Sequence, residues 1–294
     1  MLPKGLWQQH EPRAVVPLFG DAENFVDFAV QPSFAARPRN FIEPLYHLYQ
    51  KKKRFGSAAR DYANLVLRRP IAFRAIMVTR DGRYLAQWPL AQGLRVGDFF
   101  SVNVNELMAK SGVEPCDALL VLVASRGRTD LWNSSPGSAN VRYVGQHYVA
   151  GYRTGLFVRT LNPAQGSRHF GFTGLNPQIR LGGREVPGVL LINHSSDPEY
   201  DRTVSPVSRL HRNRNEFLEA PFGSIPPHGA LERSVADLFP GAAEFLAPTG
   251  GHGYLVTRNK GASLASLHLI RSRDGRSMAL DHSRPAHTNV VAYF

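Results

Sequence analysis

Apolar and polar residues alternate along most of this chain, in short runs separated by turn residues. Two runs, at 74–79 and 84–90, flank an Asp-Gly pair at Asp81-Gly82, which is typical of a tight hairpin turn. Residues 119–123 form instead a continuous apolar run, as in a strand buried on both faces. Short strands at regular spacing with turns between them are typical of a β-sandwich. The pattern therefore predicts an all-β fold from about residue 71 onward.

One pattern occurs twice. The segment from Gly97 reads GDFFSVNVNELM, and the segment from Gly229 reads GALERSVADLF. Each alternates, ends in an acidic residue followed by Leu, and leads through a polar gap to another apolar run. This predicts two tandem β-sandwich-like modules. The pairs Glu106-Leu107 and Asp237-Leu238 are expected to form a tight turn or a single helical turn, with the carboxylate capping backbone N–H groups.

Helical periodicity is confined mainly to residues 42–67, where Leu45, Leu48 and Tyr49 recur at helical spacing before Pro70. This predicts a short helical N-terminal arm. The expected organisation is an arm over residues 1–70, a first module over 71–160, a loop-rich connector over 161–184 and a second module over 185–294.

The chain is strongly basic, and this adds an expectation about partners. It has 35 Lys and Arg against 23 Asp and Glu, a formal net charge of +12, and most of the basic residues are Arg. Arginine makes bidentate contacts with carboxylate and phosphate, so an anionic partner is predicted, with a merely solvated charged face as the alternative. The chain contains no phosphate-binding glycine loop, no Gly-x-Ser-x-Gly elbow and no nucleic-acid module motif, which disfavours nucleotide binding, serine hydrolysis and nucleic-acid binding.

The cysteine content and the hydropathy of the chain predict its cellular compartment. Cys116 is the single cysteine, so an intrachain disulfide is excluded. No apolar stretch has the length of a signal peptide or of a membrane-spanning helix. These features predict a cytoplasmic protein without a membrane span. Exposed edges of a sandwich can pair, so a homo-oligomer is left open.

Arginine and aromatic residues supply the candidate binding site. One group lies in the aromatic, polar stretch around residues 141–153, and the other is an Arg-rich segment within residues 209–214. Basic side chains beside aromatic ones suit a polyanion or an acidic sugar, although aromatic residues also fill sandwich cores. The predicted ligand-binding residues are Arg142, Tyr152, Arg153, Arg209, Arg212 and Arg214.

Histidines supply a rival hypothesis. His194, His252 and His282 lie in turns of the second half, and turns at one end of a β-sandwich could bring them together in a cleft. Their spacing matches no known metal motif, and the sequence predicts no metal and no cofactor.

Taken together, the sequence favours a non-catalytic binding or assembly protein whose Arg-rich surface meets an anionic partner: an acidic glycan, a lipid headgroup or a protein. The alternative is a β-fold hydrolase or lyase that uses the His-lined cleft, with or without a metal.

Overall fold

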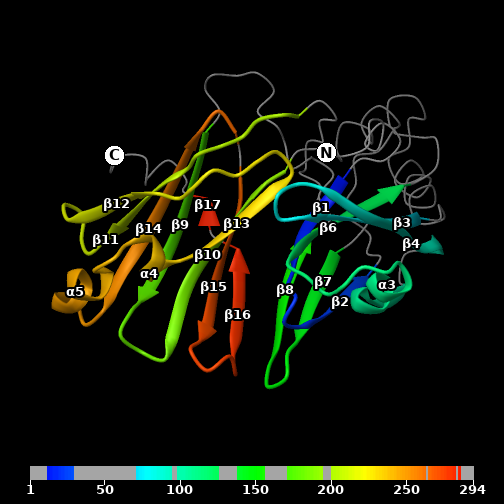
Figure 1. The fold of residues 1–294 in the computed structure, drawn as a ribbon, viewed down its shortest axis with the longest axis horizontal. Helices are drawn as coiled ribbons and strands as arrows, with labels where there is room; N and C mark the ends of the chain where they lie inside the picture. Colours follow the sequence, from blue (N-terminus) through cyan, green and yellow to red (C-terminus); the bar gives the residue numbers. More distant parts are fainter. Residues whose placement is uncertain are drawn as a thin grey trace, which may run out of the picture.

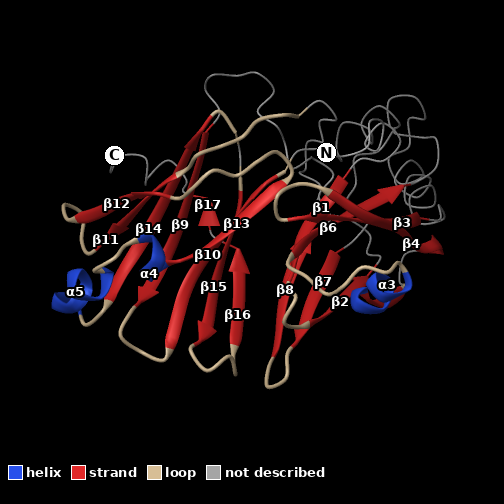
Figure 2. Cartoon of the chain, in the orientation of Figure 1, coloured by secondary structure: helices blue, strands red, loops and turns tan. Residues whose placement is uncertain are grey.

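A computed structural model describes residues 12–29, 71–94, 98–125, 138–155, 171–194, 200–262, 264–282 and 284–285 of the chain. These residues are mostly β-strands in four antiparallel sheets, with short helices between some of them (Figure 2). The predicted all-β fold is confirmed. Within the described part of the chain, no helix is long and apolar enough to cross a membrane.

The first pair of sheets is built from residues 12–155. Sheet A has the order β1-β6-β3-β4 and sheet B the order β5-β2-β7-β8. Their elements are β1 (Pro12–Leu18), β2 (Glu23–Ala29), β3 (Ile71–Thr79), β4 (Tyr84–Leu94), β5 (Phe99–Asn103), α3 (Val104–Lys110), β6 (Ala118–Ser125), β7 (Ser138–Val144) and β8 (Val149–Gly155).

The second pair is built from residues 171–285. Sheet C has the order β12-β11-β14-β9-β17 and sheet D the order β13-β10-β15-β16. Their strands are β9 (Gly171–Arg180), β10 (Glu185–Asn193), β11 (Val207–His211), β12 (Phe217–Pro221), β13 (Gly229–Ser234), β14 (His252–Lys260), β15 (Ala265–Ser272), β16 (Met278–His282) and β17 (Arg284–Pro285). Between β13 and β14 lie α4 (Val235–Leu238), α5 (Ala242–Leu246) and the 3₁₀ turn η1 (Ala247–Thr249).

The two pairs of sheets have the same strand order. Adding eight to each strand number turns β1-β6-β3-β4 into β9-β14-β11-β12, which is sheet C without β17. The same shift turns β5-β2-β7-β8 into β13-β10-β15-β16, which is sheet D. A helix follows the equivalent strand in each pair, α3 after β5 and α4 after β13.

Sheet D lies between the two hydrophobic cores. On strand β10, Val189 and Leu191 belong to the core shared with sheet C, whereas Leu190 and Ile192 belong to the core of sheets A and B. Figure 1 shows sheet C with α4 and α5 at one end of the molecule and sheets A and B with α3 at the other. Because alternate residues of a strand point to opposite faces, β10 is buried on both faces. The apolar run at residues 119–123 is likewise buried throughout, as its pattern predicts.

The repeated sequence segments form the same local structure. Residues Val104 and Val235 each begin a helix, and both side chains are buried. The Asn103 side chain accepts hydrogen bonds from the backbone N–H groups of Asn105 and Glu106, and Ser234 accepts one from Asp237. The helical turns are thus present at the expected acidic-Leu positions. The capping side chains are Asn103 and Ser234, and not the expected carboxylates of Glu106 and Asp237. A side chain just before the first turn is placed to accept hydrogen bonds from the N–H groups of that turn.

The boundaries of the sheets differ from those expected. Strands β1 and β2 lie within the predicted N-terminal arm and pair with β6, β5 and β7. Strand β9 lies within the predicted connector and pairs with β14. The helical expectation for residues 42–67 lies outside the described residues. β1 contains Pro12 and Pro17, which are tolerated because β1 is an edge strand.

Candidate functional site

The face of sheet C that points away from the core residues Leu210 and Leu255 carries aromatic rings and guanidinium groups on three neighbouring strands, and His211 on this face is only 2% exposed. The His211 ring of β11 stacks on Tyr254 of β14, with ring centroids 4.7 Å apart, and lies 5.2 Å from Phe217 of β12. The Arg209 guanidinium lies 4.4 Å from the centre of the Phe217 ring. Phe217 is 41% exposed, so this surface is apolar as well as charged. We call Arg209, His211, Phe217, Tyr254 and Arg258 the arginine–aromatic face.

Two arginines of this face lie close enough to repel each other. Arg209 pairs across the strands with Val256, and Val207 pairs with Arg258, so the two arginines are diagonal neighbours. Long side chains at such positions reach each other. The pKa of Arg258 is lowered, first by burial and then by the charge of Arg209. Glu219 of β12 forms an ion pair with Arg209 at 2.5 Å and balances part of this charge.

The other two predicted residues of this segment differ in what they can offer a ligand. Arg212 donates from Nε and Nη2 to the Glu216 carboxylate and from Nη1 to the backbone oxygen of Phe245. Its guanidinium therefore ties the β11–β12 turn to α5, which is a structural role. Arg214 lies at the exposed tip of the same turn.

The remaining predicted binding residues lie on β7 and β8 of sheet B, which sheet D separates from sheet C (Figure 1). Arg142 donates from Nε and Nη2 to the Asp27 carboxylate and lies 4.8 Å from the Phe25 ring centre. Burial raises the pKa of Asp27, but hydrogen bonds from Arg142 and Ser101 outweigh it and the net pKa is lowered. On β8, the backbone of Tyr152 pairs with Val141 and that of Arg153 with Asn140. Their side chains lie outside the described part of the structure. The six predicted residues thus do not form one surface.

The three histidines of the rival hypothesis do not share a cleft. His194 directly follows β10, whereas His252 pairs with Arg180, at the turn that precedes β10. The nine residues of β10 separate the two positions by about 30 Å, since each residue of a strand advances about 3.3 Å. The backbone of His282 pairs with Leu267, between these two ends. Within the described residues, these three positions are therefore spread along the length of β10 and are not gathered at one end of it.

His252 lines a cavity of its own. The cavity has a volume of about 350 Å³ and is lined by Gln178, Ile179, Arg180, Glu185, Pro187, His252 and Ile270. The lining combines exposed polar side chains with buried and partly buried apolar ones, which suits a small molecule, and this volume is at the lower end for such sites.

A different histidine pair lies at the opposite end of β10. The Nδ1 atoms of His194 and His228 are 3.3 Å apart, and the two rings meet edge to face. Both side chains are buried, with exposed fractions of 4% and 6%. Burial lowers the pKa of His194 well below its usual value, and the neighbouring His228 lowers it further. His228 is not among the site residues predicted from the sequence. It lies in the Pro-Pro-His-Gly turn at residues 226–229, which has a clear turn signal but no known ligand motif.

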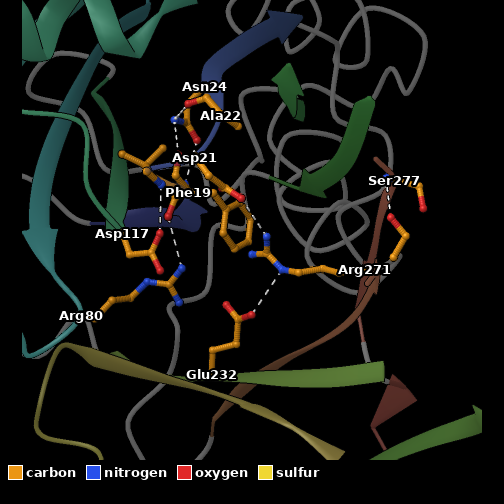
Figure 3. Close-up of polar contacts among 12 residues, drawn as sticks. Phe19, Asp21, Ala22, Asn24, Arg80, Asp117, Glu232, Arg271 and Ser277 are labelled. Carbon is orange, nitrogen blue, oxygen red and sulfur yellow. Dashed lines mark hydrogen bonds and ion pairs between the residues drawn. The ribbon is translucent and has the colours of Figure 1, made fainter. Parts of the chain in front are cut away.

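A cluster of charges joins the two pairs of sheets (Figure 3). Its centre is the buried Phe19 ring, and the guanidinium groups of Arg80 and Arg271 lie 5.5 Å and 4.8 Å from the ring centre. Arg271 of β15 forms ion pairs with Asp21 at 3.3 Å and with Glu232 at 3.5 Å. Arg271 and Glu232 belong to sheet D, whereas the other three residues precede or follow strands of sheets A and B.

Backbone groups complete this junction. Arg80 donates to the backbone oxygen of Leu18 at 3.2 Å, and the Asp117 carboxylate accepts from the N–H of Gly20 at 2.9 Å. The backbone N–H of Ala230 donates to the oxygen of Arg80 at 2.7 Å. Burial raises the pKa of Glu232, with the cations Arg271 and Arg80 opposing that rise. Because the groups of this cluster bind one another, its role is to fix how the two pairs of sheets meet.

The fold and these sites define an all-β protein with a basic, aromatic sheet face. No protein-family model matches the chain, and no curated protein matches it either.

Proposed function

We propose that this is a non-catalytic binding or assembly protein whose arginine–aromatic face on sheet C binds an anionic partner. The observation that carries the proposal is the diagonal pair Arg209 and Arg258, with the Arg209 guanidinium lying over the exposed Phe217 ring. Like charges on neighbouring strands are destabilising. An anion held between the two guanidinium groups would remove that repulsion and receive hydrogen bonds from both.

Of the anionic partners that the sequence left open, an acidic glycan fits this face best. A sugar ring can lie against the exposed Phe217. A carboxylate or sulfate on the same sugar then reaches the arginines, while Glu219 disfavours an acidic partner on the side of β12. Arg214 at the turn tip lies in the same segment and can steer the anion toward the face.

A binding titration tests the proposal. A heparin oligosaccharide is expected to bind the full chain, with an affinity that falls steeply as salt rises, because exposed charges are screened. The variants Arg209→Gln and Arg258→Gln are each expected to weaken binding about tenfold, the equivalent of one charge-assisted contact. An uncharged dextran oligosaccharide is expected not to bind.

Arg276→Gln is the matched control, because Arg276 is an exposed arginine in the β15–β16 turn, on another sheet. It should bind heparin like the unchanged protein. Equal losses in Arg209→Gln and Arg276→Gln would show that net charge alone attracts the ligand, and would contradict the proposal. Binding to anionic vesicles or to an acidic protein, but not to heparin, would assign the face to another class of partner.

We also propose that the two pairs of sheets are tandem copies of one β-sandwich module. The identical strand order and the equivalent helix caps at Asn103 and Ser234 support this proposal. In the second copy, sheet C presents the arginine–aromatic face. The corresponding strands of the first copy form sheet A, where β6 is buried on both faces. One copy is thereby adapted for recognition and the other for contact with its neighbour.

A second candidate function rests on the cavity beside His252. Its lining includes Arg180 and Glu185 as well as His252, so a β-fold enzyme could use His252 as an acid or base there. This version of the enzyme hypothesis needs neither His194 nor His282. Screening for small molecules whose binding is abolished in His252→Gln but retained in His211→Gln would favour it over the glycan-binding proposal.

A further inference from the structure

The buried His194–His228 pair has the geometry of two ligands on one metal ion. Zinc binds imidazole nitrogen at about 2.0–2.1 Å with tetrahedral angles, which places two nitrogen ligands of one ion about 3.3 Å apart. The two Nδ1 atoms are 3.3 Å apart. The rings are inclined at 71° and meet edge to face, so they do not stack on each other. We propose that His194 and His228 bind a divalent transition cation of the Zn²⁺ class through their Nδ1 atoms.

The backbone at His228 is held in a conformation that aims its side chain at His194. Among the residues that the structure describes, His228 is the one non-glycine residue with a positive φ, +60°. Such a conformation is uncommon in residues with a Cβ, and it is found where the surroundings impose it. The next residue, Gly229, approaches the backbone oxygen of Arg80 so closely that a Cβ there would lie 2.7 Å from it. Packing against the β3–β4 turn therefore fixes the His228 backbone.

A second set of contacts fixes His194 relative to this turn. Asn193, the residue before His194, donates its side-chain amide to the backbone oxygens of Ile225 and Pro226, at 3.1 Å and 3.0 Å. The Tyr200 hydroxyl donates to the Asn193 side-chain oxygen, and the Tyr200 ring lies 5.7 Å from His228. The backbones of both histidines are thus connected through one buried amide. Such outer contacts orient the ligands at known metal sites.

The donor set selects the kind of cation. Two neutral imidazoles favour Zn²⁺, Cu²⁺ or Ni²⁺ over Mg²⁺ or Ca²⁺, which prefer oxygen. A proton carried by one Nδ1 atom in the hydrogen bond of the pair moves to the Nε2 atom of the same ring when the metal binds, so both imidazoles stay neutral. Among the described residues, no third His, Cys, Asp or Glu joins the pair. Water or an anionic ligand would then complete the coordination.

Calorimetric titration of the full chain with ZnCl₂ tests the proposal, with MgCl₂ as the comparison. We expect one Zn²⁺ per chain, no Mg²⁺ binding, and at least a tenfold loss of Zn²⁺ affinity in His228→Asn and in His194→Asn. Asparagine tolerates a positive φ, so His228→Asn removes the ligand while keeping the turn. His252→Gln is the matched control, because it removes an exposed histidine from the other end of β10.

Nitrogen NMR of the unchanged protein gives a second measurement that does not depend on the variants folding. Zn²⁺ is expected to shift the Nδ1 resonances of two histidines and to leave their Nε2 atoms protonated. The proposal is overturned if Zn²⁺ fails to bind, if it binds with unchanged affinity to His228→Asn and His194→Asn, or if no histidine Nδ1 resonance moves. In any of these cases the pair is a structural hydrogen bond.

Discussion

Single positions decide how the two pairs of sheets meet. Gly82 in the β3–β4 turn has φ +82°, and a Cβ there would lie 2.3 Å from the backbone oxygen of Pro227. The adjacent turn of the second pair carries His228, with its own positive φ. Two unusual backbone conformations therefore face each other at the junction, and neither turn can change shape without displacing the other.

Gly82→Ala is expected to destabilise the fold more than Gly112→Ala. Gly112 also has a positive φ, +67°, but no atom lies within 4 Å of its added Cβ. In both variants the new alanine must adopt the left-handed conformation, which lowers the free energy of unfolding by about 1–2 kcal/mol. Gly82→Ala adds the clash with Pro227, a further loss of about 1–3 kcal/mol. Urea unfolding of the two variants measures the difference, and equal losses would show that the two turns do not pack as described.

At the scale of elements, the short helices depend on their caps. Asn103→Ala and Ser234→Ala should each reduce the free energy of unfolding by about 1 kcal/mol, because each leaves backbone N–H groups of the first helical turn without an acceptor. Glu106→Gln is expected to cost about 0.5 kcal/mol or less, because it removes only a charge near the helix N-terminus. Thermal unfolding compares the three, and a larger loss in Glu106→Gln would favour the carboxylate as the cap.

Several of the strands and helices could be predicted from local patterns in the sequence. Alternation and the Asp-Gly pair correctly located β3, β4 and their turn, because hairpin formation depends on neighbouring residues. The repeated acidic-Leu segments correctly located α3 and α4. β1 was missed because Pro12 and Pro17 argue against a strand, and only its place at the edge of sheet A makes them acceptable. Strand β9 was missed because its Gly and Asn residues resemble a loop.

At the scale of the whole molecule, the charge cluster around Phe19 couples stability to pH. Arg271→Ala removes both ion pairs and leaves the partly buried Glu232 without its nearest cation. The cost should be about 1–2 kcal/mol at pH 7, between the values for exposed and buried pairs, because the Arg271 and Glu232 side chains are 29% and 31% exposed. Burial already raises the pKa of Glu232, and the acids Asp117 and Asp21 raise it further. When the folded state raises the pKa of a carboxyl, the free energy of unfolding falls as pH rises from the unfolded-state pKa through the raised folded-state pKa. The loss in Arg271→Ala should therefore be smaller at pH 5 than at pH 7.

Urea unfolding at the two pH values measures this difference. Arg276→Ala, in the exposed β15–β16 turn, is the control and should change stability by less than about 0.5 kcal/mol at both. A loss in Arg271→Ala that does not depend on pH would mean that the packing of Arg271 against Phe19, and not its charge, holds the junction.

The sites were harder to predict than the fold, because they depend on contacts between distant segments. Residues 209–214 are rich in arginine, which the sequence shows directly, but Arg258 comes beside Arg209 only through the pairing of β11 with β14. His194 was selected, whereas its neighbour His228 is 34 residues away in the chain. His252 was grouped with His194 because both lie in turns, and the length of β10 separates them. The number of residues between two histidines does not show whether their turns lie at the same end of a sheet.

The burial of strand β10 on both faces limits where anything else can attach. Both of its sides are covered by the hydrophobic cores of neighbouring layers, so a partner has no access to this strand from either face. In the part of the chain that the structure describes, sheet C lies on one side of sheet D, and sheets A and B lie on the other (Figure 1). Partners attached to sheet C and to sheet A or B would therefore be kept apart by at least the thickness of the middle layer.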